Sequence, residues 1–313
     1  MSELIDLSQL PAPDAVETLD FETLFADRKK RFISLYPKEQ QTEVARTLEY
    51  ESEPAVKILQ ENAYLELNLR QRINEAAVAN MLAYSTGADL DNLGANFKVK
   101  RKLISPGDSA AVPPIEAEYE SDIELRRRIQ LAFDGLNTAG SLDAYIFYAL
   151  SAHASIRDAS AWSPAPCEMI VTILCREGNG TAPPDVLDSV YHYFGVTADG
   201  QNATTPSKVR PQGDKLTVQA ARIVHWRIQA TIFTLPGPDP ELVLQQARQA
   251  VQVYAVAQHK LGRDITLSGI YAALHQPGTQ RVLLESPSSD LVMSEEQAGW
   301  CDEIILTPGG SDV

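Results

Sequence analysis

The sequence predicts an α+β protein in which a helical N-terminal domain precedes two small mixed α+β units, each a short sheet with packed helices. Two observations carry this prediction. Apolar residues recur at helical spacing through residues 19–102, whereas from about residue 153 runs of strand-like alternation are separated by further helical runs. With 313 residues, of which 44% are hydrophobic and 22% charged, the chain is long enough to bury several cores.

The first segments predict an arm followed by a helix. Residues 1–18 contain two prolines and are typical of an extended arm that becomes ordered on docking. Asp20 suits the N-cap of the next helix, which begins the helical domain of residues 19–102. Phe21 and Phe25 lie on the apolar side of that helix, and we consider both as candidate interface residues.

A long helix is predicted from Pro54 to about residue 85, because proline suits the first helical turn. A single apolar stripe at steps of three and four follows along it: Leu65, Leu69, Ile73, Ala77, Met81 and Tyr84. Gly87 ends this run and a short helix follows. Residues 103–120, rich in proline, serine and alanine, have the composition of a linker.

Two α+β units are predicted after the linker. The central unit, residues 121–210, has a helix pair at about 121–135 and 141–152, strands at 155–162 and 167–175, and a helix at 184–194. Ser121 followed by Glu124 is the pattern of a capping box. The C-terminal unit, residues 211–307, has strands at 215–221, 224–235, 280–287 and 303–308 and helices between them, and residues 308–313 form a polar tail.

Composition excludes several classes of partner. The formal net charge of −15 provides no cationic field for nucleic acid or an anionic membrane. We expect no signal peptide and no membrane span, and therefore synthesis in a cytoplasm. The three cysteines form no C-x-x-C pair, and each is expected to be a small buried hydrophobe: Cys167, Cys175 and Cys301.

Three consecutive arginines, Arg126, Arg127 and Arg128, precede two glycines and a second helix. On a helix, three successive positions are spread over most of the circumference, so they cannot form one cationic face for a phosphate or a nucleic acid. We interpret the stretch as a joint, with Ile123, Ile129 and Phe133 as its core stripe. The arginines are candidate interface residues that pair with carboxylates, on this chain or on a neighbouring subunit.

Catalytic patterns are weak. The five histidines are scattered without metal-ligand spacing, so no metal site, catalytic residue or cofactor-binding residue is predicted. One alternative stays open: a hydrolase with an Asp, Glu and His site in the α+β region. Its candidate residues are Asp214, His225 and His259.

The order of five loose motifs resembles the baseplate J-like family of contractile-tailed phages. The motifs are "TGADLDNLGANFKVKR", "ESDIELRRRIQLAFDGLNTAGSLDAYIFYALS", "IRDASAWSPAPCEMIVTILCREGNG", "VRPQGDKLTVQAARIVHWRIQATI" and "HKLGRDITLSGIYAALHQPGTQRVLLESPSSDLV" with "WCDEIILT". The resemblance covers about residues 50–307. The chain departs from the family at Cys167, where relatives often have glycine, and in the short segment 103–118, where longer relatives have an inserted domain.

The resemblance implies a structural protein of the virion tail without catalysis or cofactor. Members build the wedges of a six-fold baseplate and form an inner ring around the hub. The implied partners are further copies of the chain, a small sheath-initiator protein, a companion outer wedge protein that leads to the tail fibres, and hub or spike proteins. The implied location is the tail baseplate, after synthesis in the host bacterial cytoplasm. A spike itself is not indicated, since no short-period repeat is visible.

Overall fold

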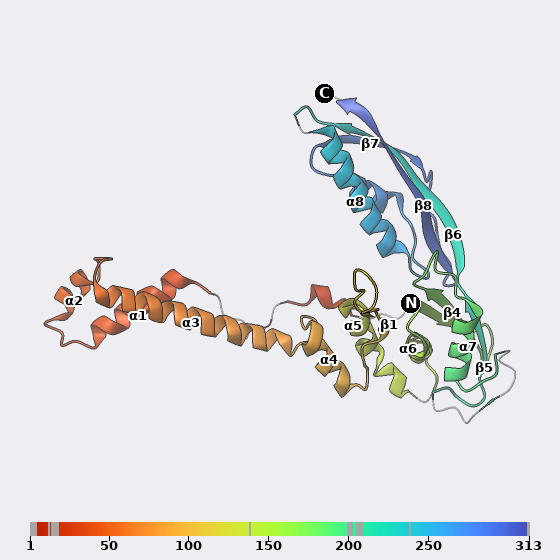
Figure 1. Cartoon of the computed structure of the whole chain (residues 1–313), viewed down its shortest axis with the longest axis horizontal. Helices are drawn as coiled ribbons and strands as arrows, with labels where there is room; N and C mark the ends of the chain where they lie inside the picture. The colour runs from red at the N-terminus through yellow and green to blue at the C-terminus, as the bar shows by residue number, and fades with distance from the viewer. Residues whose placement is uncertain are drawn as a thin grey trace. The chain divides into compact units, whose positions relative to one another are not determined.

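The computed structural model in Figure 1 divides into two compact units, Ile5–Lys100 and Arg101–Val313. It describes residues 5–311 except 12, 14–18, 138, 199–202, 205–208 and 238. Helices and short mixed sheets make up the fold, so the predicted α+β class with a helical N-terminal region is confirmed. No helix within the described part of the chain is both long and apolar enough to cross a bilayer.

The unit of residues 5–100 is helical. Its elements are η1 (Leu7–Gln9), α1 (Phe21–Ser34), α2 (Gln41–Thr47), α3 (Pro54–Ala79) and α4 (Gly87–Asn96). Asp20 caps α1 by accepting a hydrogen bond from the Glu22 amide at 3.1 Å, as predicted. A small core of Leu48, Val56 and Leu59 joins α3 to the two preceding helices.

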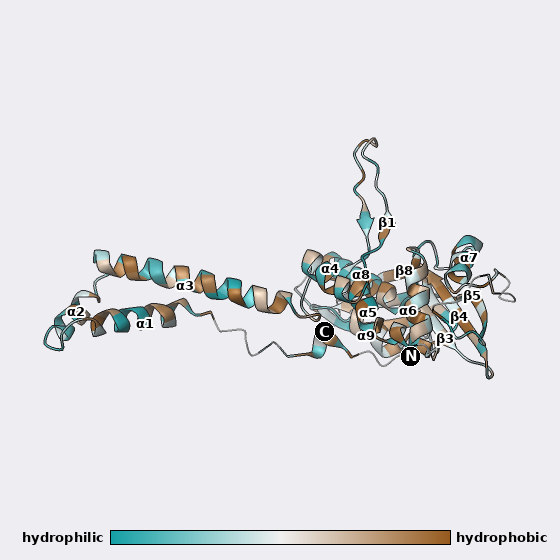
Figure 2. Ribbon diagram, turned by 90° about the horizontal axis from the view of Figure 1, so that it is seen from below, coloured by the Kyte–Doolittle hydropathy of each residue, from teal (hydrophilic) through white to brown (hydrophobic). Residues whose placement is uncertain are grey.

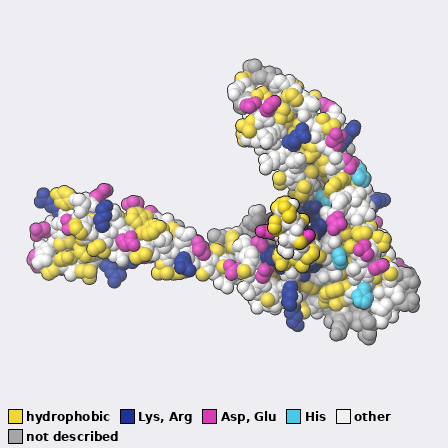
Figure 3. Space-filling model, in the orientation of Figure 1, with side chains coloured by type: hydrophobic (Ala, Val, Ile, Leu, Met, Phe, Trp, Pro, Cys, Tyr) yellow, Lys and Arg dark blue, Asp and Glu magenta, His cyan; other side chains and the backbone are white. Residues whose placement is uncertain are grey.

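Helix α3 exposes the stripe that its sequence pattern marks as apolar. The helix ends at Ala79 rather than near residue 85, and its buried positions are Val56, Leu59, Ala63 and Asn74. More than half of the surface of Leu65, Leu69 and Ile73 is exposed. Figure 2 shows apolar residues along α3, and in Figure 3 hydrophobic side chains gather on this unit.

The predicted linker is instead a β-hairpin that opens the unit of residues 101–311. Strands β1 (Leu103–Ser105) and β2 (Glu118–Tyr119) pair antiparallel, and a further bridge joins Asp108 to Ile115. Figure 2 shows this hairpin projecting from the rest of its unit. Gly107 permits the close approach, because its φ is +71° and a Cβ there would lie 2.7 Å from the backbone of Ile115. Backbone pairing thus orders a segment whose composition alone suggests disorder.

The central sheet has the order β3-β4-β5 and is covered by helices. Its elements are α5 (Asp122–Leu131), η2 (Asp134–Leu136), α6 (Leu142–Ala152), β3 (Ile156–Trp162), β4 (Glu168–Cys175), α7 (Pro184–Tyr193) and β5 (Lys215–Ala220). Alternate residues of β4, among them Met169, Val171 and Ile173, pack in one core with α6 and α7. The helix pair, both strands and the helix at 184–194 lie where the sequence predicts them.

Strand β5 belongs to this central sheet and not to the C-terminal unit, where we placed it. It runs parallel to β4, with Glu168 opposite Lys215 and Ile173 opposite Ala220. Helix α7 supplies the crossover that a parallel pair needs. Strand pairing across about 40 residues of chain is not visible in a local pattern, which is why the sequence suggests the wrong sheet.

The C-terminal sheet has the order β7-β6-β8 and packs on two helices. Its elements are β6 (Arg222–Thr234), α8 (Pro240–Gln258), α9 (Leu267–Leu274), β7 (Thr279–Ser286) and β8 (Gln297–Ser311). Trp226, Ile228, Ala230 and Ile232 face the helices in a core of their own. Of residues 308–313, which we expected to form a polar tail, 308–311 extend β8 instead, since β8 pairs in parallel with β6 as far as Ser311; residues 312 and 313 lie outside the described part of the chain.

The turn between β3 and β4 holds Cys167 in a left-handed conformation. Its φ is +61° and its thiol is exposed, so it is not the buried hydrophobe that we expected; Cys175 is buried and Cys301 half-buried. The turn forms nonetheless: the Glu168 amide donates to Ala165 O at 3.0 Å and the Lys215 amide to Cys167 O at 2.7 Å. A residue with a Cβ bears a conformational penalty there that glycine avoids.

Replacing Cys167 with glycine should therefore stabilise the protein. We expect the unfolding free energy of Cys167→Gly to rise by about 0.5–1 kcal/mol, because relief of left-handed strain outweighs the greater backbone entropy of glycine. Urea unfolding followed by tryptophan fluorescence measures the change. Cys167→Ser keeps the strain and should stay within about 0.5 kcal/mol of wild type. Equal stability of the two variants would contradict the explanation.

Candidate functional site

Helix α5 begins at a complete capping box. The Ser121 hydroxyl accepts from the Glu124 amide at 3.4 Å, and the Ser121 amide donates to the Glu124 carboxylate at 3.3 Å. The buried positions of the helix are Leu125, Arg128, Ile129 and Leu131. The predicted core stripe is confirmed at Ile129, which is buried, and is wrong at Ile123 and Phe133, which are 74% and 65% exposed. Arg128 occupies a buried position of α5, which a search for apolar residues at helical spacing does not predict.

Arg128 is buried in an ion pair with Glu120, the last residue of the hairpin segment. Its Nη1 lies 2.5 Å from Glu120 Oε2, and their side chains are only 8% and 1% exposed. The same carboxylate oxygen accepts from the Lys102 amide at 3.1 Å, and Arg101 donates to Glu120 O at 2.7 Å. The pair thus ties α5 to both strands at the base of the hairpin.

Arg127 faces another carboxylate. Its Nη1 lies 2.7 Å from Oδ1 of Asp158 on β3, whose second oxygen accepts from the Leu261 amide at 3.0 Å. Asp158 is buried, so its contacts with α5 and with Leu261, which lies between α8 and α9, are shielded from water. Arg126 lies half-buried on the same helix.

A third ion pair and a buried lysine complete the cluster. Arg176 at the end of β4 lies 2.5 Å from Glu124 of α5. Lys102 Nζ donates to Leu150 O and, at 3.1 Å, to His153 O, so its amine closes the C-terminal end of α6. Burial, followed by the charge of Arg128, lowers the pKa of Lys102 to about 7. The cavity among these groups is about 20 Å³, room for one water molecule.

Two of the three arginines that we predicted as interface residues thus make contacts inside the unit of residues 101–311, and the interface role of all three stays a prediction. Arg127 and Arg128 pair with carboxylates of their own chain, which fits a joint between elements. Three further members of the cluster were missed by sequence reasoning: Lys102, Glu120 and Asp158. A single acidic residue within the otherwise buried strand β3 is the signal that could have identified Asp158.

The two predicted aromatic interface residues lie together on α1. The rings of Phe21 and Phe25 are stacked with centroids 5.9 Å apart, and Lys29 Nζ lies 4.4 Å from the centroid of Phe25. Both rings are half-buried, and Phe25 packs against the small core of its unit. Their role as interface residues stays a prediction.

The three residues of the hydrolase alternative have separate partners. The Asp214 carboxylate accepts from the Tyr145 hydroxyl at 2.8 Å, and His259 is buried with its Nδ1 2.8 Å from Gly299 O. Burial lowers the pKa of His259. Within the described ranges, no group of three or more His, Cys, Asp or Glu side chains is placed to hold a metal ion.

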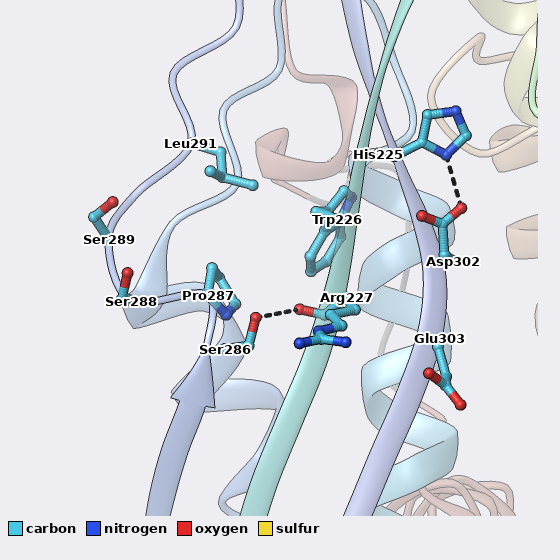
Figure 4. Close-up of a pocket in the computed structure, with 10 residues that line it drawn as sticks. All are labelled: His225, Trp226, Arg227, Ser286, Pro287, Ser288, Ser289, Leu291, Asp302 and Glu303. Atoms are coloured by element: carbon cyan, nitrogen blue, oxygen red, sulfur yellow. Dashed lines mark hydrogen bonds and ion pairs between the residues drawn. The ribbon is translucent and has the colours of Figure 1, made fainter.

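The third, His225, lines a hollow of about 560 Å³ on the C-terminal sheet, shown in Figure 4. Its Nδ1 lies 2.7 Å from Asp302, and both side chains are about half exposed. The Ser286 hydroxyl in the same hollow donates to Arg227 O at 3.4 Å rather than to the histidine. For His225 to activate the Ser286 hydroxyl as a nucleophile, the two side chains would have to be in contact. Instead His225 contacts Asp302, and Ser286 donates to Arg227 O.

Comparison with known proteins places the chain in a family. The model of the baseplate J-like N-terminal domain matches residues 51–108, and that of the baseplate J-like protein C-terminal domain matches residues 226–307. The chain is also 50% identical to "Baseplate protein J" of Escherichia phage P2 over 309 residues, which is 99% of each chain. The chain belongs to the baseplate J-like family.

In the sequence of this baseplate J-like chain, the two matched domains flank most of the charged cluster, while Lys102 lies within the N-terminal match. The N-terminal match includes α3, α4 and β1, and the C-terminal match includes nearly the whole of the β7-β6-β8 sheet with its helices. Residues 109–225, which contain α5 and the central sheet, lie between the matched domains. The cluster of Glu120, Arg128 and Asp158 therefore belongs to the part that connects them.

Proposed function

We propose that the chain is a structural component of the baseplate wedge of a contractile tail and resides in the virion. Copies of it form an inner ring in a six-fold baseplate around the hub. They bind a small sheath-initiator protein, an outer wedge protein that leads to the tail fibres, and hub or spike proteins. The observation that carries the proposal is the 50% identity to a phage baseplate protein along 99% of both chains.

The surface of the helical unit supports a role in assembly. Leu65, Leu69 and Ile73 expose an apolar stripe on α3, bordered by Arg28 and Arg70 around a hollow of about 480 Å³. An exposed apolar stripe with a polar rim is typical of a surface that packs against another protein. In the unit of residues 101–311, the buried Glu120–Arg128 ion pair holds the base of the hairpin against α5.

Deleting the gene from the genome that encodes the chain tests the proposal. We expect particles without complete contractile tails, restoration by a plasmid copy, and antibody labelling at the end of the tail distal to the head in electron micrographs. Complete, contractile tails in the deletion strain would exclude a structural role in the baseplate.

Polar substitutions on α3 should separate assembly from folding. In the double variant Leu69→Gln with Ile73→Gln, we expect the free energy of unfolding to change by less than about 0.5 kcal/mol per site, because both side chains are exposed. Thermal unfolding followed by the helical circular dichroism signal measures it. Incorporation of the protein into tails should fall at least tenfold, as the apolar contact is lost. Gln71→Ala, an exposed change toward the other side of α3, is the matched control. Normal incorporation of the double variant would exclude this stripe as an interface.

A further inference from the structure

The chain passes from the central sheet to the C-terminal sheet at one residue. Strand β5 ends at Ala220 and β6 begins at Arg222. The Ala221 amide donates to Ile173 O of the central sheet at 2.9 Å, and the next amide, of Arg222, donates to Glu296 O beside β8 at 2.9 Å. Two successive peptide groups are therefore bonded to different sheets, which places a pivot at Ala221.

Little apolar surface joins the two sheets beyond that pivot. Each sheet has its own hydrophobic core with its own helices. Between them lies a small cluster of Leu174, Ala221, Leu261 and Ala298. Parts with separate cores and a small shared contact move as rigid bodies when the contacts at their boundary open.

The boundary is held mainly by polar contacts from β3, the edge strand of the central sheet. Arg157 Nη2 donates to Val256 O at 2.8 Å, Ser160 Oγ to Glu295 O at 2.6 Å, and Trp162 Nε1 to the Glu296 carboxylate at 2.9 Å. The register of β3 against β4 shifts between Ile156 and Asp158. That bulge leaves Arg157 without a partner residue on β4, and bulges of this kind turn a side chain toward a new neighbour.

Asp158 is the central contact of this boundary. Its buried carboxylate accepts from Arg127 on α5, from its own neighbour Ala159 at 2.9 Å, and from the Leu261 amide of the C-terminal unit at 3.0 Å. Hydrogen bonds to an ionised carboxylate are about twice as strong as neutral ones. Opening the boundary would leave the Leu261 amide without this acceptor while Arg127 keeps the carboxylate oriented.

We propose that Ala221 is the pivot of a two-state hinge and that the Asp158 contacts are its latch. With the latch closed, the C-terminal sheet is fixed against the central one; with it open, the C-terminal sheet rotates about Ala221 as one body. The hinge follows from the contacts of this chain alone. Its use, which rests on the proposed baseplate function, is to let the wedge change shape during contraction without breaking either core.

Distance measurements on the full-length chain test the hinge. Spin labels on the exposed Cys167 and on Gln249→Cys of α8, in a Cys301→Ser background, report on the two bodies. We expect one narrow distance distribution for the latched chain, and a second, longer population that increases about tenfold or more in Asp158→Asn. Trp162→Phe removes only the hydrogen bond to Glu296, so it should increase the longer-distance population less than Asp158→Asn does. Asp188→Asn, an exposed carboxylate of α7, is the control. A single distance distribution, unchanged in both Asp158→Asn and Trp162→Phe, would overturn the hinge.

A reversible lock tests its use in the particle. Ser160→Cys with Glu295→Cys places two thiols across the boundary between the sheets, where Ser160 Oγ now donates to the backbone oxygen of Glu295 at 2.6 Å. Tails carrying the oxidised pair should assemble and fail to contract, and reduction should restore contraction. Contraction of fully oxidised tails would overturn the role in contraction. Failure of the proposed function itself would be seen differently, as complete tails in the gene deletion.

Discussion

Glu120→Gln is expected to lower the free energy of unfolding of the residue 101–311 unit by about 3–5 kcal/mol. The substitution keeps the side-chain size and removes the charge that neutralises Arg128, whose guanidinium would remain buried. Breaking one partner of a buried pair costs far more than the pair itself contributes, because the remaining ion has lost its solvation and its counter-charge. Urea unfolding followed by tryptophan fluorescence reports on this unit alone, as Trp162, Trp226 and Trp300 all lie in it.

Two companion variants make this expectation specific. Glu118→Gln, a change at an exposed residue of β2 two positions before Glu120, should alter the free energy of unfolding by less than about 0.5 kcal/mol. Glu120→Leu combined with Arg128→Met should recover most of the loss, because an apolar pair of similar volume carries no desolvation penalty. A loss below about 1 kcal/mol for Glu120→Gln would mean that water reaches Arg128 and that the pair does not hold the hairpin base.

Between pH 7 and pH 8.5 the protein should become more stable as pH rises. Burial, with the nearby charge of Arg128, lowers the pKa of Lys102 to about 7, whereas an unfolded lysine titrates near about 10.4. In this window the unfolded chain binds more protons than the folded one, so the unfolding free energy increases with pH, by up to about 1.4 kcal/mol per pH unit for one group. Below pH 7 the amine is charged in both states and this gain is absent.

Lys102→Met should flatten that pH dependence, and Lys215→Met, an exposed lysine of β5, should leave it intact. Burial also lowers the pKa of Lys260, which adds a slope of the same sign that both variants retain. The window closes near pH 8.5, because burial raises the pKa of the Cys175 thiol to about 11 and its unfolded-state ionisation then favours unfolding. An unchanged slope in Lys102→Met would show that the amine titrates normally.

Local signals predicted the elements well. The capping box at Ser121, the helix at 184–194 and the alternation of β4 each depend on contacts within a few residues, and each lies where the pattern indicates. Pairing between strands that lie far apart in the sequence was not predictable in the same way. Strand β5 pairs with β4 across α7, and the hairpin of residues 103–119 is held by backbone bonds that proline-rich composition conceals.

The charged cluster shows why a site of this kind escapes pattern analysis. Periodicity assigns buried positions to apolar residues, so the predicted core stripe contained Ile123, Ile129 and Phe133. Of these only Ile129 is buried, whereas the buried Arg128 was not expected to face the core. Only the fold brings Glu120 from before the helix to Arg128, and Asp158 from after it to Arg127. The family could be recognised because the order of its motifs persists through about residues 50–307, even where individual burial predictions fail.

The hairpin of residues 103–119 also offers a site where a foreign sequence can be inserted. Val112 at its tip is 98% exposed, while the pairing of Leu103 with Tyr119 and the bond from the Glu120 amide to Lys102 O close its base. Lengthening a loop whose ends are already held together costs little entropy, about 0.6 kcal/mol for each doubling. A folded tag grafted at Val112 would therefore be displayed away from both cores, which makes this tip a natural handle for labelling or retargeting a tail particle.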